Sequence, residues 1–421
     1  MKTKQRCCEQ TGTSESTGIS EQTANDIADH NRRDFLKMSA GTGAAVAGGV
    51  ALGAVPTLGF ADDFSPTSTD ESIFRGSRPR EAFFQRFKAA RFQFFQFLNQ
   101  GPQNDNDDEQ RYAGENYYAS FTKTLPSDQY GEVDPVAFEQ LVTAMRTGEG
   151  AAFDAIPLDA EAQRALANPQ GAFKFDMEGI DSHATRMNPS HTFRSAEIAG
   201  EEAEVYWQAL TRDVPFINYG DDPLTNAAVS DLSQMSAPPG LPAHGSVSTD
   251  TLFRGETPGD LVGPYISQFL WHDVTFGPVE FEQRYQVPTA GLDFMKDTDN
   301  WLAIQRGAAP SEVATFDDTK RYIYNNRALG EYVHRDVSFQ AYLHAALMLL
   351  GYGPSAFDTG NPYRALITNQ GPFTSLGGPF ILDMVTKAAN LALQAAWSHK
   401  WRVHRFLRPE ALGGRIHFHM T

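Results

Sequence analysis

Two basic residues near the end of the sequence, Lys400 and Arg408, have types and a spacing suited to binding an anion. They lie about two helical turns apart, and Pro409 disfavours helical backbone at the arginine before it. Lysine offers a point charge and arginine a planar fork of donors, so the pair could approach one small tetrahedral oxyanion from different directions. Basic residues also complement the helix dipole in a last turn, and the spacing alone does not decide between the two interpretations.

We expect the helix that carries these residues to cover 379–407 and to end before Pro409. Positions three, four and seven residues from Lys400 share its face and are mostly apolar, so a bare ammonium would be costly to desolvate unless an anion meets it. Trp397 and His404 lie on this face and are candidates to line the pocket. An aromatic residue there is more often part of the core, and a histidine more often bonds a neighbouring helix.

The rest of the chain is expected to be mainly α. Apolar residues recur at helical spacing in several segments, and no alternating segment is long enough to predict a major sheet. The segment 212–300 is expected to form long loops with short helices. The further helices are expected over 79–99, 134–147, 195–211 and 319–350, the last with a weakening at Gly330.

Composition narrows the class of protein. The 421 residues are 41% hydrophobic, and the net charge of −17 argues against a nucleic-acid partner. Both cysteines, Cys7 and Cys8, lie in the N-terminal tail, which leaves the body of the chain without a thiol for catalysis, disulfides or zinc.

The N-terminus resembles a twin-arginine export signal. Arg32-Arg33 precedes a weakly apolar, glycine-rich run from 38 to 58 and a small-residue cleavage pattern that ends at Ala61. We interpret 1–61 as a removed signal rather than a permanent membrane anchor, 62–78 as a linker and 79–421 as one helical domain. The expected location is the periplasm or outside the cell.

Residues 400–411 with Gly413-Gly414 resemble the first vanadate-binding motif of the vanadium-dependent haloperoxidases, in the algal bromoperoxidase form, where seven residues separate the lysine from Arg-Pro. The similarity extends over most of 79–417. Further segments that carry it are 123–134, 168–183, 206–213, 252–269 and 332–342.

The resemblance implies a helical-bundle fold of the haloperoxidase/acid phosphatase type and a bound vanadate that accepts hydrogen peroxide and oxidises a halide, which then halogenates an organic acceptor. It implies that Lys400 and Arg408 contact the vanadate oxygens, with Trp397 and His404 at the pocket. Family members assemble, so a homo-oligomer is expected.

The sequence departs from the family pattern after Arg408. The family's Pro-Ser-Gly-His segment and its later arginine and vanadium-bonding histidine do not occur, so no catalytic residue and no metal ligand is assigned. The expectation is a C-terminally incomplete chain that is inactive alone. Two alternatives stay open: a non-catalytic helical remnant or scaffold, and an acid phosphatase. The halide and the organic acceptor also stay open.

Overall fold

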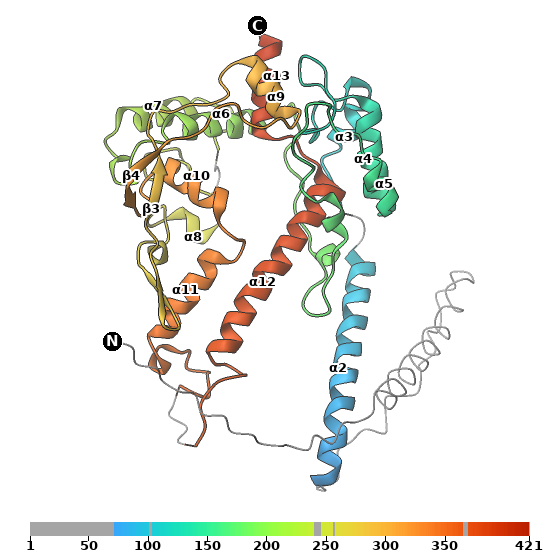
Figure 1. The fold of residues 1–421 in the computed structure, drawn as a ribbon, viewed down its shortest axis with the longest axis vertical. Helices are drawn as coiled ribbons and strands as arrows, with labels where there is room; N and C mark the ends of the chain where they lie inside the picture. Colours follow the sequence, from blue (N-terminus) through green and yellow to red (C-terminus); the bar gives the residue numbers. More distant parts are fainter. Residues whose placement is uncertain (1–70, 101–102, 240–245, 256, 365–368, 421) are drawn as a thin grey trace, which may run out of the picture. The chain divides into compact units, whose positions relative to one another are not determined.

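The computed structural model describes residues 71–100, 103–239, 246–255, 257–364 and 369–420 (Figure 1). The expected export signal at 1–61, both cysteines and the first part of the expected linker lie outside these residues. The chain divides into two units, Met1–Glu81 and Ala82–Thr421. The elements from α3 to α13 all belong to the second unit.

The described chain is mainly helical, as the sequence predicts (Figure 1). Short 3-10 turns and long loops connect the helices. The helices are α2 (Glu71–Gln100), α3 (Asp108–Arg111), α4 (Pro135–Thr147), α5 (Gly150–Asp154), α6 (Ala196–Leu210), α7 (Pro223–Leu232), α8 (Pro258–Leu261), α9 (Thr298–Gln305), α10 (Asn326–Arg335), α11 (Gln340–Gly351), α12 (Gly378–Ser398) and α13 (Pro409–Met420).

Local capping signals set the ends of α4 and α6 close to where the sequence predicts them. The Asp134 side chain accepts a hydrogen bond from the Ala137 amide at 2.9 Å, and the Ser195 hydroxyl accepts one from the Ile198 amide at 3.2 Å. Helix α4 ends at Gly148, whose φ of 71° is left-handed and suits glycine.

The strands form two small antiparallel sheets. β1 (Val274–Phe276) pairs with β2 (Val279–Phe281), and β3 (Tyr285–Pro288) pairs with β4 (Phe316–Arg321). The single helix expected over 319–350 is therefore wrong: its start is strand β4, and the remainder is split into α10 and α11. Strand β4 is highly charged, and its partner strand lies about thirty residues earlier, so no local pattern indicates it.

Helix α2 begins at Glu71, eight residues before the start expected at Pro79. The expectation followed from apolar residues at helical spacing, which begin at Phe83. Part of the segment 62–78, expected to be a linker, is thus helical. Several large apolar side chains of α2 in the second unit expose 40–59% of their surface; they are Phe83, Phe87, Phe92, Phe94, Phe95 and Leu98.

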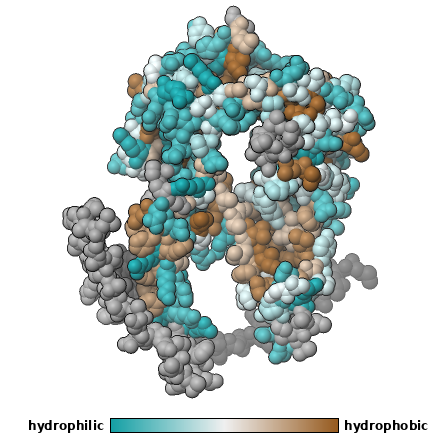
Figure 2. Space-filling model, turned by 180° about the vertical axis from the view of Figure 1, so that it is seen from behind, coloured by the Kyte–Doolittle hydropathy of each residue, from teal (hydrophilic) through white to brown (hydrophobic). Residues whose placement is uncertain are grey.

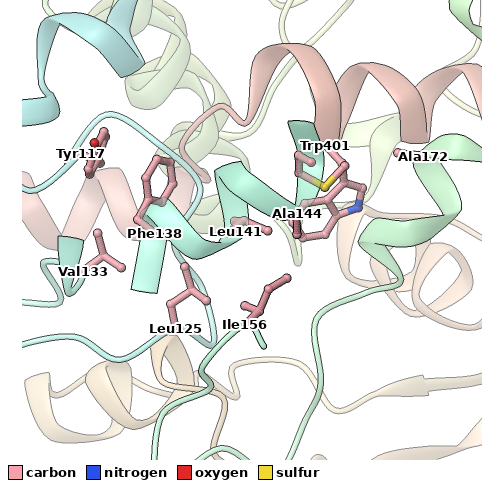
Figure 3. Close-up of a cluster of buried hydrophobic side chains, with 10 residues drawn as sticks. Tyr117, Leu125, Val133, Phe138, Leu141, Ala144, Ile156, Ala172 and Trp401 are labelled. Atoms are coloured by element: carbon pink, nitrogen blue, oxygen red, sulfur yellow. The ribbon is translucent and has the colours of Figure 1, made fainter. Parts of the chain in front are cut away.

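The main hydrophobic core joins α4 to the chain that follows α12 (Figure 3). The indole of Trp401 is fully buried in it, and Phe138, Leu141 and Ala144 of α4 belong to the same cluster. The ring of Phe121 meets that indole edge-on at 5.2 Å between centroids. Burial of these large side chains anchors the segment that contains Lys400.

Hydrophobic residues also gather on the surface where α11 packs against α12 (Figure 2). The exposed apolar side chains of these helices are Tyr342, Leu349, Met384 and Leu393. None of the helices in the described residues combines the length and apolar character needed to cross a membrane.

The helix expected over 379–407 differs at its C-terminal end. Helix α12 stops at Ser398, and residues His399–His404 form a π-helical turn. Arg405 then has a left-handed φ of 30°, and Pro409 begins the new helix α13, which the sequence analysis missed. Pro409 starts α13 because its fixed φ suits the first turn of a helix.

Candidate oxyanion site

The π-helical turn sets the positions of the candidate residues. The amide of Arg405 donates to the carbonyl oxygen of Lys400 at 3.1 Å, a bond that spans five residues rather than four. A π turn inserts one residue into the helical ladder and is frequent at functional sites. The α-helical face from which Trp397, Lys400 and His404 were grouped therefore does not continue beyond Ser398.

Lys400 lies among aromatic rings. Its ammonium nitrogen is 5.4 Å from the ring centroid of Phe121, 5.0 Å from that of Trp397 and 5.2 Å from that of Trp401. Ring faces attract a cation, but they do not replace a counter-ion. No carboxylate of the described residues forms an ion pair with Lys400. Burial, followed by the charge of Arg408, lowers the pKa of this lysine.

Arg408 is half-exposed and forms an ion pair with Glu410. Its Nε donates to Oε1 of Glu410 at 2.6 Å, and the Nζ of Lys123 reaches the same oxygen at 3.1 Å. Burial alone would raise the pKa of the Glu410 carboxyl, but a backbone hydrogen bond and the charges of Arg408 and Lys123 hold it below its usual value. Glu410 thus links two cations.

The structure brings Lys400 and Arg408 within electrostatic reach of each other, since the charge of Arg408 contributes to the lowered pKa of Lys400. It adds Lys123, which lies 287 positions before Glu410 and which sequence reasoning did not assign to the site. We call Lys123, Lys400, Arg408 and Glu410 the cation cluster. Three positive groups and one carboxylate leave it with a net positive charge, which favours an oxyanion.

Trp397 packs against the main hydrophobic core and also lies beside Lys400. Its indole nitrogen donates to the carbonyl oxygens of Ala167 and Asn168, at 3.2 and 3.1 Å, and its ring packs against the main core. These bonds fix the ring whose face lies 5.0 Å from the Lys400 nitrogen. Trp397 therefore limits the water around that ammonium.

His404 is partly exposed and lies beside the buried His399. Its ring stacks on that of His399, with 5.6 Å between centroids, and neither of its ring nitrogens has a hydrogen-bond partner in the described residues. Burial, followed by the charge of His399, lowers its pKa, and the other charges that act on it are those of Asp105 and Arg405. Its electrostatic neighbours thus differ from those of Lys400.

A buried carboxyl on α6, which sequence reasoning also missed, lies near the cation cluster. Burial, with the charge of Glu410 second, raises the pKa of Glu202 to about 7. A side chain at Gly413 would meet Tyr206 and Glu202, with its Cβ 2.3 Å from the tyrosine oxygen, so α13 approaches α6 closely at this point. In the sequence, Glu202 belongs to a run that looks like a solvated acidic face, so nothing indicates its burial.

Comparison with known proteins identifies the N-terminal segment. Residues 29–49 match the model of the TAT (twin-arginine translocation) pathway signal sequence. This confirms the predicted export signal.

The body of the chain is similar to known enzymes. It is 36% identical over 311 residues to a vanadium-dependent bromoperoxidase of Ascophyllum nodosum, a match that covers 71% of this chain and 55% of that protein. It is 31% identical to a vanadium-dependent bromoperoxidase of Corallina pilulifera, over 76% of this chain and 63% of that protein. The chain thus spans 55–63% of the length of these two relatives.

A solved structure agrees with the sequence matches. The homohexameric second vanadate-dependent bromoperoxidase of Ascophyllum nodosum aligns with a TM-score of 0.71 and 29% identity, over 88% of this chain and 61% of that one. The helical fold of the described residues is therefore the fold of that protein over the aligned part.

Proposed function

We propose that the chain functions in a vanadium-dependent haloperoxidase reaction, which oxidises a halide with hydrogen peroxide and halogenates an organic acceptor. The proposal follows from its membership, over most of its length, of the vanadium-dependent bromoperoxidase family. Because the chain spans less than two thirds of its relatives' length, the proposal concerns the part of the reaction to which the described residues contribute. The observation that carries it is the cation cluster, in which Lys400 is half-buried and has no anionic partner in the described residues.

The residues of the cation cluster fit the oxygens of vanadate. Lys400 would offer a point charge and Arg408 its guanidinium fork, both charge-assisted donors. Vanadate, when bound, would supply the oxidising chemistry by accepting the peroxide. In the described residues no group of three or more His, Cys, Asp or Glu side chains is arranged to hold a metal ion, so the proposal is confined to the vanadate oxygens.

The protein's own contribution at this place is electrostatic. Fixed cations in a partly dehydrated site stabilise negative charge without having to reorganise, which is the usual basis of oxyanion stabilisation. The rings around Lys400 limit the water around its ammonium, and Glu410 holds Arg408 and Lys123 on one carboxylate oxygen. An arriving oxyanion would compete with Glu410 for Arg408.

Binding of orthovanadate by the chain, measured by equilibrium dialysis, tests this proposal. We expect Lys400→Ala and Arg408→Ala each to weaken binding at least tenfold, since each removes one charge-assisted donor. Lys387→Ala is the matched control, because Lys387 is on α12 and pairs with Glu178 and Asp383, outside the cation cluster. Binding that is unchanged in both site variants would contradict the assignment.

Activity assays separate the three candidate functions. Bromination of an organic acceptor with vanadate, peroxide and bromide supports the haloperoxidase, and hydrolysis of p-nitrophenyl phosphate would instead support the phosphatase. Absence of vanadate binding together with absence of both activities would favour a scaffold.

We also propose that the chain assembles with copies of itself. The supporting observations are the homohexameric state of the Ascophyllum relative and the exposed apolar residues of α2 and of the α11–α12 surface. Contiguous apolar patches on a surface commonly mark interfaces. Light scattering coupled to size-exclusion chromatography tests this, and a monomer at micromolar concentration would contradict it.

A further inference from the structure

The most exposed methionine of the described residues lies on a segment that packs against α12. Met177 exposes 88% of its surface, whereas Met145 of α4 exposes 5% and belongs to the main hydrophobic core. The further exposed methionines of the described residues are Met187, Met384 and Met420. The chain thus presents one thioether almost wholly to solvent and buries another in its core.

Contacts on both sides of Met177 hold its backbone against α12. The carboxylate of Asp176 accepts a hydrogen bond from Nε2 of Gln394. The carboxylate of Glu178 forms an ion pair with the ammonium of Lys387. The exposure of Met177 is therefore that of a residue whose two chain neighbours are both bound to one helix.

This segment lies beside the part of α12 that leads to the candidate oxyanion site. Gln394 precedes Lys400 by six positions, a rise of about 9 Å along a helix. The residues just before the segment also touch the site, since the carbonyl oxygen of Asn168 accepts from the indole nitrogen of Trp397 at 3.1 Å. Met177 is therefore close to the place where the proposed reaction would release its oxidant.

Thioethers are the most easily oxidised side chains in the body of the chain. Both cysteines lie in the N-terminal tail, so no thiol competes with the methionines there. A thioether is soft and polarisable, and two-electron oxidants convert it to the sulfoxide. Hypohalous acid, the halide-oxidation product of the proposed reaction, is an oxidant of this class.

We propose that Met177 is a sacrificial oxidation site, whose thioether hypohalous acid converts to the sulfoxide before it oxidises the core. With hypobromous acid, the sulfur lone pair attacks bromine and displaces hydroxide. Water then bonds to sulfur, bromide leaves, and two protons are lost, one of which neutralises the hydroxide. Sulfur loses two electrons and bromine gains them, so the net products are sulfoxide, bromide and one proton. The source of the oxidant rests on the proposed function, whereas the choice of Met177 rests on its exposure.

The two sulfurs differ in what their oxidation does to the fold. Oxidation turns an apolar side chain into a polar one. At Met177 the new oxygen is in water, so no buried contact changes. At Met145, in the cluster that contains Trp401, the same oxygen would be buried among apolar side chains, which is costly without a hydrogen-bond donor. Met177 therefore consumes oxidant without loss of the fold.

Limited oxidation of the full chain with added hypobromous acid, followed by tryptic digestion and mass spectrometry, tests the choice of site. Trypsin separates the two sulfurs, because Met145 and Met177 fall in the fragments 124–146 and 175–186. We expect Met177 to form sulfoxide at least tenfold faster than Met145, because only its sulfur is accessible. In a digest made before oxidation, where both sulfurs are accessible, the two rates should agree within about twofold.

A second experiment supplies the oxidant by turnover, with vanadate, peroxide and bromide, and compares it with the same mixture without bromide. We expect bromide-dependent sulfoxide at Met177 to exceed that at Met420, which is similarly exposed but lies at the end of α13. Met177→Leu should abolish the signal in 175–186, and Met420→Leu, the control, should leave it unchanged. If turnover gives no sulfoxide while added hypobromous acid still selects Met177, the proposed function fails and the oxidation site stands. The site is overturned if added hypobromous acid leaves Met177 unmodified or oxidises Met145 equally fast in the folded chain.

Discussion

Lys400 lies in the π-helical turn and Arg405 follows it directly, but the two lie in opposite electrostatic environments. Arg405 is buried and holds both carboxylate oxygens of Glu109, at 2.6 and 2.8 Å, while its Nη1 donates to the carbonyl of Trp401 at 2.8 Å. Lys400 has three aromatic rings around its ammonium and no anionic partner in the described residues. The comparison indicates that a buried cation paired with a carboxylate stabilises the fold, whereas a cation without an anionic partner is available for a ligand.

The largest expected effect concerns the ion pair between Arg405 and Glu109. Glu109→Ala would leave the Arg405 guanidinium buried without its counter-ion, and removal of one partner of a buried pair costs about 3–5 kcal/mol. We expect the free energy of unfolding to fall by that order, measured by urea denaturation. A loss below about 1 kcal/mol would mean that the pair contributes no more than an exposed one.

Glu202 extends the comparison to a buried anion that no cation pairs with in the described residues. Its folded pKa of about 7 lies above the usual 4.5, so between these pH values the folded state binds a proton that the unfolded state has lost. Stability is therefore lost as pH rises from about 4.5 to 7. At pH 8 the penalty is about 3 kcal/mol.

Glu202→Gln removes this penalty, because a neutral amide has no charge to desolvate. The variant should be more stable than the unmodified chain at pH 8, and this advantage should shrink towards pH 5. Thermal unfolding across this range measures the difference. A parallel pH dependence in both proteins would show that Glu202 titrates normally.

Lys400→Met tests the role of the cation that has no anionic partner in the described residues. The substitution keeps most of the apolar stem and removes a half-buried charge without a partner, so we expect the free energy of unfolding to change by less than about 1 kcal/mol. Vanadate affinity should fall at least tenfold, which corresponds to about 1.4 kcal/mol. A large loss of stability would place Lys400 with Arg405 among the residues that serve the fold.

Local signals predicted the parts of the fold that are decided locally. The side chains of Asp134 and Ser195 cap α4 and α6 at the residues the sequence indicates. Strand β4 was missed because Tyr285 and Arg321, which lie opposite each other across the sheet, are far apart in the chain. The π-helical turn was missed because burial of Trp401 and the left-handed backbone of Arg405 have no signature in helical spacing.

The residues of the candidate site also fall into two groups, those that the local sequence predicted and those that it did not. Lys400 and Arg408 were identified because they lie on one short segment that resembles a family motif. Lys123 and Glu202 were not assigned to it, since their proximity depends on how α6 and the segment before α4 meet the start of α13. Glu410 was also not assigned, although it lies only two positions after Arg408. Spacing along one helix cannot show which distant charges complete a site.

Glu410 provides the smallest and most discriminating test of the comparison, because it decides how available the cation cluster is. Its carboxylate occupies Nε of Arg408 and Nζ of Lys123, and an oxyanion must compete with it for Arg408. Glu410→Gln keeps the shape and removes the charge, so we expect vanadate to bind about three- to tenfold more tightly, an effect of about 1 kcal/mol. Equilibrium dialysis of this variant beside Lys387→Ala measures the change. Weaker binding would mean that Glu410 positions Arg408 for the ligand rather than competing with it, and the cluster would then function as a preassembled unit.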